Sequence, residues 1–188
     1  MNMLTLDELK LVGGALCLDF ANTADRADDG TILAEALLDA NAWTAWLQRV
    51  GISAPPPPLE RALVLRTAIY RLFAAVARGE VPTDADIDTL NVLAARARTH
   101  QRWTRQRDGS YVRTLMYDGD EHALLALAIS VDEILCSPAF ELIRQCDGDN
   151  CGWLFLDTSK NHTRRWCDMT DCGNRAKARR FLDRKRTR

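Results

Sequence analysis

Four of the chain's six cysteines lie close together near its C-terminus, as two pairs with the same internal spacing. The pairs are Cys146 with Cys151 and Cys167 with Cys172; four residues separate the members of each pair, and 15 residues separate the pairs. Two such pairs can surround one Zn²⁺ with four thiolates. A site closed by four protein ligands has no open position for a substrate. We therefore predict one structural Zn²⁺ per chain and a small module built around it.

Two other uses of these cysteines compete with the zinc interpretation. Disulfides form in oxidising compartments, whereas the N-terminal sequence MNMLTLDELK lacks the basic and then apolar pattern of a secretory leader. No apolar run approaches the ~20 residues needed to cross a bilayer. We therefore expect a cytoplasmic protein with reduced thiols and no membrane partner. An iron–sulfur cluster also takes four thiolates, but its usual spacings fit less well.

The charged residues divide the chain into two unlike parts. The whole chain has 25 Lys and Arg against 26 Asp and Glu, but residues 158–188 carry 11 basic and three acidic residues. The net charge is therefore +8 in this segment and −9 in residues 1–157. Such asymmetry is typical of a chain whose basic end binds a polyanion. A basic tail that is merely solvated, or that rests on the acidic part, is the alternative.

The first part of the chain, residues 1–139, is predicted to be mainly helical. Apolar residues recur at helical spacing in four segments: Asn41–Val50, Leu59–Arg78, Thr83–Arg98 and Glu121–Cys136. Between the last two, Asp108 and Gly109 separate two β-forming segments, 101–106 and 110–117, which predicts a hairpin. The expected class is α+β: a mainly helical domain with a small β-hairpin, followed by the metal module.

A segment near the start, LVGGALCLDFANTAD, has two glycines and a short apolar run before several polar residues. We predict a strand at 15–19 that leads into a helix or turn. Asp19, Asn22 and Thr23 could then converge on a small-molecule effector. Such residues more often satisfy nearby backbone N–H groups at the end of a helix.

The C-terminal part, residues 140–188, is predicted to be a treble-clef-like zinc finger. A strand at 140–145 would lead to Cys146, and the turn-forming residues DGDN would close a knuckle before Cys151. Segments 153–156 and 163–166 would pair as a hairpin. Cys172 would then lie at the N-terminus of a helix over 173–186, where the helix dipole favours a thiolate.

That last helix is predicted to have an apolar and a basic side. Ala178, Phe181 and Leu182 follow the i, i+3, i+4 pattern and are expected to pack on the aromatic residues of the module. Arginine predominates among the basic residues, which suits bidentate contacts to phosphate or guanine. The residues predicted to bind nucleic acid are Arg164, Arg165, Arg175, Lys177, Arg179, Arg180 and Arg184. Arg175 could instead brace the metal loop, because it is close to Cys172.

The sequence from Cys146 to Arg180 resembles the CGNR-type zinc finger, which is named for the run Cys172-Gly173-Asn174-Arg175. The N-terminal run L-V-G-G-A-L-C-L-D-F-A-N-T resembles the start of the ABATE domain, which usually precedes that finger. Together the two resemblances cover nearly the whole chain. They imply a bacterial, stress-induced transcription regulator whose finger binds DNA.

Three classes of function are consistent with these features of the sequence. The first is a regulator that binds duplex DNA through the finger, while the N-terminal domain senses a ligand or forms a homodimer. The second is RNA binding, because the same basic finger suits RNA and its tryptophans could stack on bases. The third is a protein-interaction module with a purely structural metal. An enzyme is not expected, because His100, His122 and His162 are scattered along the sequence.

Overall fold

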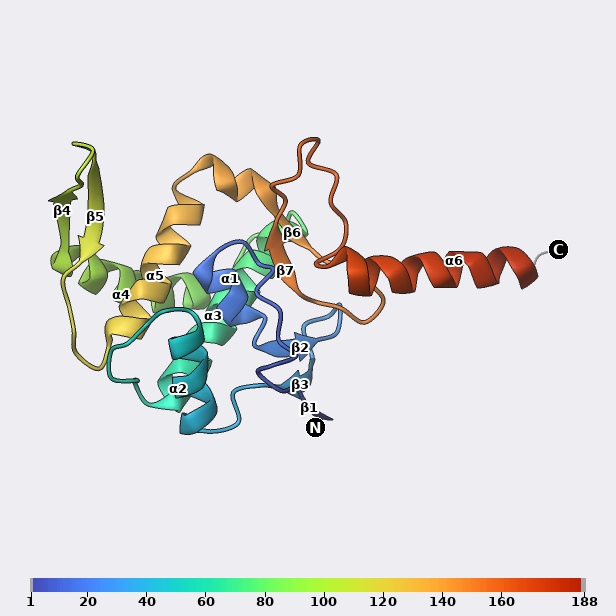
Figure 1. The fold of residues 1–188 in the computed structure, drawn as a ribbon, viewed down its shortest axis with the longest axis horizontal. Helices are drawn as coiled ribbons and strands as arrows, with labels where there is room; N and C mark the ends of the chain where they lie inside the picture. The colour runs from blue at the N-terminus through green and yellow to red at the C-terminus, as the bar shows by residue number, and fades with distance from the viewer. Residues whose placement is uncertain (1, 187–188) are drawn as a thin grey trace.

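The computed structural model describes residues 2–186, and about half of these residues are helical (Figure 1). A small sheet near the N-terminus has three strands, β1 (Asn2–Met3), β2 (Ala24–Arg26) and β3 (Ile32–Glu35). β3 lies in the middle, parallel to β1 and antiparallel to β2. None of the described helices is both long enough and apolar enough to cross a membrane.

Five of the helices in the described part of the chain form the body of the protein, and four of them confirm the helical segments predicted from periodicity. These four are α2 (Ala40–Arg49), α3 (Leu59–Ala77), α4 (Asp84–His100) and α5 (His122–Leu135). The Thr83 side chain accepts a hydrogen bond from the backbone N–H of Asp86 and so caps α4, as expected. Phe20, Trp43 and Trp46 pack together at the centre of the core, with ring centroids 5.1–5.6 Å apart.

The fifth helix, α1 (Leu16–Ala21), replaces the strand predicted at 15–19, so that prediction was wrong. Cys17, Leu18, Phe20 and Ala21 are all buried. A short element that is apolar on nearly every side carries no periodicity, so a buried helix and a buried strand look alike in sequence. The Asp19 side chain accepts a hydrogen bond from the backbone N–H of Gly13 and ties the preceding loop to the first turn of α1.

The predicted hairpin around Asp108 and Gly109 is present. It consists of β4 (Gln101–Arg105) and β5 (Tyr111–Leu115), which pair antiparallel over their whole length. The β4–β5 hairpin projects from one end of the molecule, and the C-terminal helix projects from the opposite end (Figure 1).

The cysteine-rich part has a knuckle and a helix in the expected order, but its hairpin differs from the prediction. Only the second half of the strand predicted at 140–145 is present, as β6 (Ile143–Gln145). The first half belongs to a 3-10 turn at Pro138–Leu142. β7 (Leu154–Leu156) pairs with β6, and residues 163–166 form no strand. The reason is local: the buried carboxylate of Asp157 accepts hydrogen bonds from Ser159 and from the N–H of Arg164, which curls the loop around it.

Helix α6 (Asn174–Arg186) follows a π-helical turn at Met169–Gly173 and confirms the predicted helix. Its predicted packing was wrong. Phe181 and Leu182 are 59% and 56% exposed, and no side chain of α6 is buried. The helix projects away from the body after the metal module (Figure 1), and Ala178, Phe181 and Leu182 are all exposed on it.

Candidate metal centre and basic helix

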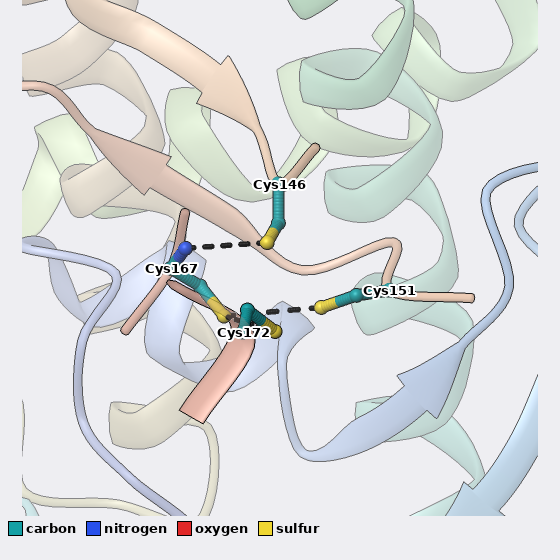
Figure 2. Close-up of side chains that lie close together, drawn as sticks. All are labelled: Cys146, Cys151, Cys167 and Cys172. Carbon is teal, nitrogen blue, oxygen red and sulfur yellow. Dashed lines mark hydrogen bonds between the residues drawn. The ribbon is translucent and has the colours of Figure 1, made fainter. Parts of the chain in front are cut away.

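The four cysteines of the C-terminal module converge on one point. Cys146 follows β6, and Cys151 precedes β7 (Figure 2). Cys167 precedes the turn that leads into α6, and Cys172 lies within that turn. All four are buried, and their sulfur atoms lie within 4.8 Å of one another. None of them is part of a disulfide.

The sulfur spacing fits a tetrahedral metal ion. The Sγ atom of Cys167 lies 3.8 Å from that of Cys151 and 3.6 Å from that of Cys172. A Zn–S bond of about 2.3 Å in a regular tetrahedron places neighbouring sulfurs about 3.8 Å apart. A disulfide would need about 2.0 Å between the sulfurs. The donor set and its spacing therefore suit a thiolate-bound ion.

Backbone and side-chain donors surround the sulfur atoms. The N–H groups of Cys167 and Gly148 donate to Cys146 Sγ at 3.3 and 3.4 Å, and the guanidinium of Arg175 donates to Cys172 Sγ at 2.9 Å. Hydrogen bonds from the Cys151 and Cys167 thiols, together with these N–H groups, lower the pKa of Cys146 well below that of an ordinary thiol. Donors of this kind stabilise thiolates and orient metal ligands.

Gly148 has a steric role in the knuckle. A Cβ atom at this position would lie 2.9 Å from Cys172 Sγ and 3.3 Å from Cys146 Sγ. The chain can therefore pass this close to the sulfur atoms because the residue is glycine. Asn150 completes the turn in the left-handed region, with φ of 57°.

The metal module is joined to the N-terminal domain along β2 and the loop that follows it. The backbone N–H of Gly152 donates to the carbonyl of Arg26 at 2.7 Å, and that of Cys151 donates to the carboxylate of Asp28 at 3.1 Å. The indole N–H of Trp153 donates to Asp25 at 2.8 Å. Ile143, Leu154 and Leu156 belong to the main hydrophobic core. The knuckle strands are therefore built into the body.

The three polar residues considered as an effector site all bind other parts of the protein. The buried Asn22 side chain donates to the carbonyl of Leu154 and accepts from its N–H. Thr23 donates to the carbonyl of Phe20 and accepts from Arg66. Asp19 accepts from Gly13, and burial raises the pKa of the Asp19 carboxyl. A cavity of about 260 Å³ lies elsewhere, between β2 and the finger, with Asp25, Trp153 and Arg175 on its wall.

Four of the seven residues predicted to bind nucleic acid form hydrogen bonds or ion pairs within the finger, as the following contacts show. The guanidinium of Arg164 lies 4.2 Å above the Phe155 ring and donates to the carbonyls of Trp166 and Cys167. Arg165 pairs with Asp147, and Arg179 with Asp149. Arg175 binds the sulfur of Cys172, as its position suggested.

The other three residues lie on the exposed surface of α6. Arg180 lies 6.0 Å from the centre of the Trp166 ring, and Arg184 also has a partner. Lys177 makes no hydrogen bond or ion pair with the described residues. Nucleic-acid binding by all seven basic residues stays a prediction.

Sequence reasoning missed the residues that join the two parts of the chain. Asp25 and Asp28 meet the finger across more than 100 positions of sequence, and no local pattern predicts such contacts. One of these contacts had a sequence signal. Asn22 directly follows an apolar run, and a polar side chain buried there needs a hydrogen-bond partner.

The buried four-cysteine centre, set beside a helical domain, defines a protein of the zinc-finger class. The family model of the CGNR zinc finger matches residues 143–185. The ABATE family model, described as "Putative stress-induced transcription regulator", matches residues 14–138. The chain belongs to the ABATE family, because this match covers well over half of its length, and it carries a CGNR zinc finger. Neither family is described as an enzyme. A search of curated proteins gave no match.

Proposed function

We propose that the protein is a DNA-binding transcription regulator in which one structural Zn²⁺, held by Cys146, Cys151, Cys167 and Cys172, positions α6 for contact with duplex DNA. The observation that carries this proposal is the isolation of α6. The helix has seven basic residues against one acidic residue, and none of its side chains is buried.

A helix of this length that packs on nothing else is expected to be stabilised by a binding partner. Helices shorter than about 12–15 residues are marginal in water without tertiary packing, and α6 has 13 residues. A phosphate backbone would supply charge for the arginines and would stabilise the helix. At ~20 Å long, α6 also has dimensions that the major groove of B-DNA accepts.

The zinc assignment is tested by elemental analysis of the purified protein. We expect about one Zn²⁺ per chain, and we expect Cys167→Ser to lose it because three thiolates leave the tetrahedron incomplete. Absence of zinc from the parent protein, or full zinc in the Cys167→Ser protein, would contradict the assignment.

DNA binding is tested by titrating the zinc-loaded protein with duplex DNA and duplex RNA across a range of salt concentrations. Lys177→Gln/Arg179→Gln/Arg180→Gln should weaken DNA binding and flatten the salt slope by about 2.7, because each lost phosphate contact removes about 0.9. The matched control, Arg71→Gln/Arg98→Gln/Lys160→Gln, removes three charges outside α6 and should bind like the parent. Unchanged binding in the α6 variant would favour a protein-interaction module, and preference for RNA would favour the RNA-binding alternative.

The exposed residues Phe181 and Leu182 support a homodimer in which a second copy covers this part of α6. Two linked fingers would bind one DNA molecule more tightly than one finger does, because the second contact is intramolecular. Sedimentation of the parent and of Phe181→Ser/Leu182→Ser tests this: the parent should be a dimer and the variant a monomer. A monomeric parent would contradict it.

The N-terminal domain is proposed to control the finger through β2. An effector could bind in the cavity between β2 and the finger. The wall of this cavity includes Asp25 and Trp153, which are hydrogen-bonded to one another. An effector that separates this pair would shift the knuckle that holds Cys151. Trp153→Phe removes this bond permanently, so its DNA affinity should equal that of the effector-bound parent and should no longer change when the effector is added.

A further inference from the structure

The β4–β5 hairpin has a face of two aromatic and two arginine side chains. In an antiparallel pair, directly opposed residues lie on the same face, and alternate residues of each strand share it. Trp103 is opposite Arg113, and Arg105 is opposite Tyr111. These four residues therefore form one surface, the aromatic–arginine face, in which each ring has an arginine across from it.

None of these four side chains has a partner in the part of the chain that the structure describes. Trp103 is 81% exposed and Tyr111 is 67% exposed. Arg105 and Arg113 are exposed too, and neither forms an ion pair with a described residue. Large aromatic side chains left in water in this way are typical of binding surfaces.

The charge of the hairpin is opposite to that of the domain around it. Residues 101–115 contain four arginines and one aspartate, within a segment, residues 1–157, whose net charge is −9. A local excess of positive charge on an acidic domain favours an anionic partner, such as the phosphates of a nucleic acid.

We propose that the aromatic–arginine face binds single-stranded nucleic acid, with Trp103 and Tyr111 stacking on bases and Arg105 and Arg113 contacting phosphates. Aromatic platforms flanked by cations are the usual means of holding unpaired bases, whose ring faces are free. Trp103 and Tyr111 are diagonal neighbours across the two strands, and such positions are about 7–8 Å apart. Two neighbouring bases could therefore each find a ring.

This contact is separate from the one proposed for α6. The hairpin and α6 project from opposite ends of the molecule (Figure 1), so one surface can be changed without touching the other. The inference shares with the proposed function only the class of partner, and it remains valid if α6 binds nothing.

The test uses zinc-loaded full-length protein and a labelled single-stranded oligothymidylate. All proteins, including the parent in this test, carry Lys177→Gln/Arg179→Gln/Arg180→Gln, so that binding by α6 contributes less to the measurement. Trp103→Ala/Tyr111→Ala should weaken binding tenfold or more, because stacking is lost without any change of charge. Arg105→Gln/Arg113→Gln should flatten the salt slope by about 1.4, since each phosphate of a single strand contributes about 0.7.

Two control variants lie on the same hairpin. Val112→Ala/Met116→Ala removes exposed apolar surface from its other face, and Arg102→Gln/Arg107→Gln removes two charges outside the aromatic–arginine face. The first control should lose less affinity than the aromatic variant, and the second should change the salt slope less than the Arg105→Gln/Arg113→Gln variant. The proposal is overturned if the parent does not bind, or if a control loses as much affinity as its test variant. It is also overturned if the aromatic variant instead dissociates a dimer, because the partner would then be a second copy.

Discussion

Asn22 binds Leu154 as a neighbouring strand would. Its side-chain amide donates to the Leu154 carbonyl at 2.8 Å, and its side-chain oxygen accepts from the Leu154 N–H at 2.9 Å. Asn22 follows α1 and is 1% exposed, while Leu154 begins β7, three residues after Cys151. One side chain therefore satisfies both backbone groups of a metal-knuckle strand that is buried in the core.

Asn22→Ala should destabilise the protein by about 2–4 kcal/mol, because a buried donor and a buried acceptor are each left unsatisfied. Urea unfolding of the zinc-loaded protein measures this loss. Asn161→Ala, in an exposed loop of the finger, is the control and should unfold like the parent. Equal midpoints for the two variants would show that Leu154 does not depend on Asn22.

A second prediction concerns the buried ion pair beneath the N-terminal sheet. Arg66 donates to both carboxylate oxygens of Glu35, at 2.7 and 2.5 Å, and the two side chains are 2% and 9% exposed. Glu35→Ala should cost about 3–5 kcal/mol, because it leaves the Arg66 charge buried without a partner. Thermal or urea unfolding measures this cost.

The double variant Glu35→Leu/Arg66→Met tests the cause of that loss. It should be clearly more stable than Glu35→Ala, because it removes the unpaired charge and keeps apolar volume. Glu80→Ala breaks the exposed pair with Arg78 and should hardly change the stability, because solvent screens this pair. A double variant as unstable as Glu35→Ala would indicate that the lost packing, and not the charge, dominates.

A third prediction concerns pH. Glu121 is 6% exposed and binds Arg61 of α3 at 2.5 Å and Arg96 of α4 at 3.0 Å. The hydrogen bond from Arg61 lowers the pKa of Glu121. The stabilisation is therefore complete above the unfolded-state pKa of about 4.3 and is lost as the pH falls through the lower folded-state pKa.

Glu121→Gln should accordingly lower the unfolding free energy by about 1–2 kcal/mol at pH 7, a modest loss because both arginines are half exposed. The difference from the parent should shrink below pH 4, where the parent carboxylate also becomes neutral. Urea unfolding at a series of pH values measures it. A difference that stays constant from pH 7 to pH 3 would mean that the charge of Glu121 is not its cause.

The sequence predicted the local structure of each segment better than it predicted how the finger packs against the helical domain. Regular spacing was sufficient for α2 to α5, for the β4–β5 hairpin and for the meeting of the four cysteines, because each follows from a pattern of neighbouring residues. The resemblance to the ABATE domain and the CGNR zinc finger was also confirmed. The apolar run that forms α1 was ambiguous because it is buried on nearly every side.

The errors in the finger come from the loop that curls around Asp157 and from the docking of the finger on the helical body. Leu154 and Leu156 pack into the main core, and β7 pairs with β6 instead of with residues 163–166. The prediction that Phe181 is buried assumes that the finger must bury its own apolar residues. The helical body supplies that burial instead, and Phe181 remains exposed.

The last prediction separates two basic residues that are two positions apart on α6. Arg175 donates to the ligand sulfur of Cys172 and lies 3.5 Å from the carboxylate of Asp171, whereas Lys177 has no such contact. Arg175→Ala should weaken zinc binding about 10–100-fold, as the loss of a group that supports a metal ligand typically does. Arg175→Lys should recover part of the loss, since it keeps the charge and lacks the planar fork. Chelator competition measures both.

Lys177→Ala should behave in the opposite way. Zinc affinity should match that of the parent, because Lys177 does not contact the sulfur cluster, while the salt slope for duplex DNA should fall by about 0.9 for one phosphate. The pair of variants thus divides the basic residues of α6 into those that hold the metal loop and those that face the DNA. If Arg175→Ala kept the zinc affinity of the parent and lost DNA binding, Arg175 would belong to the second group.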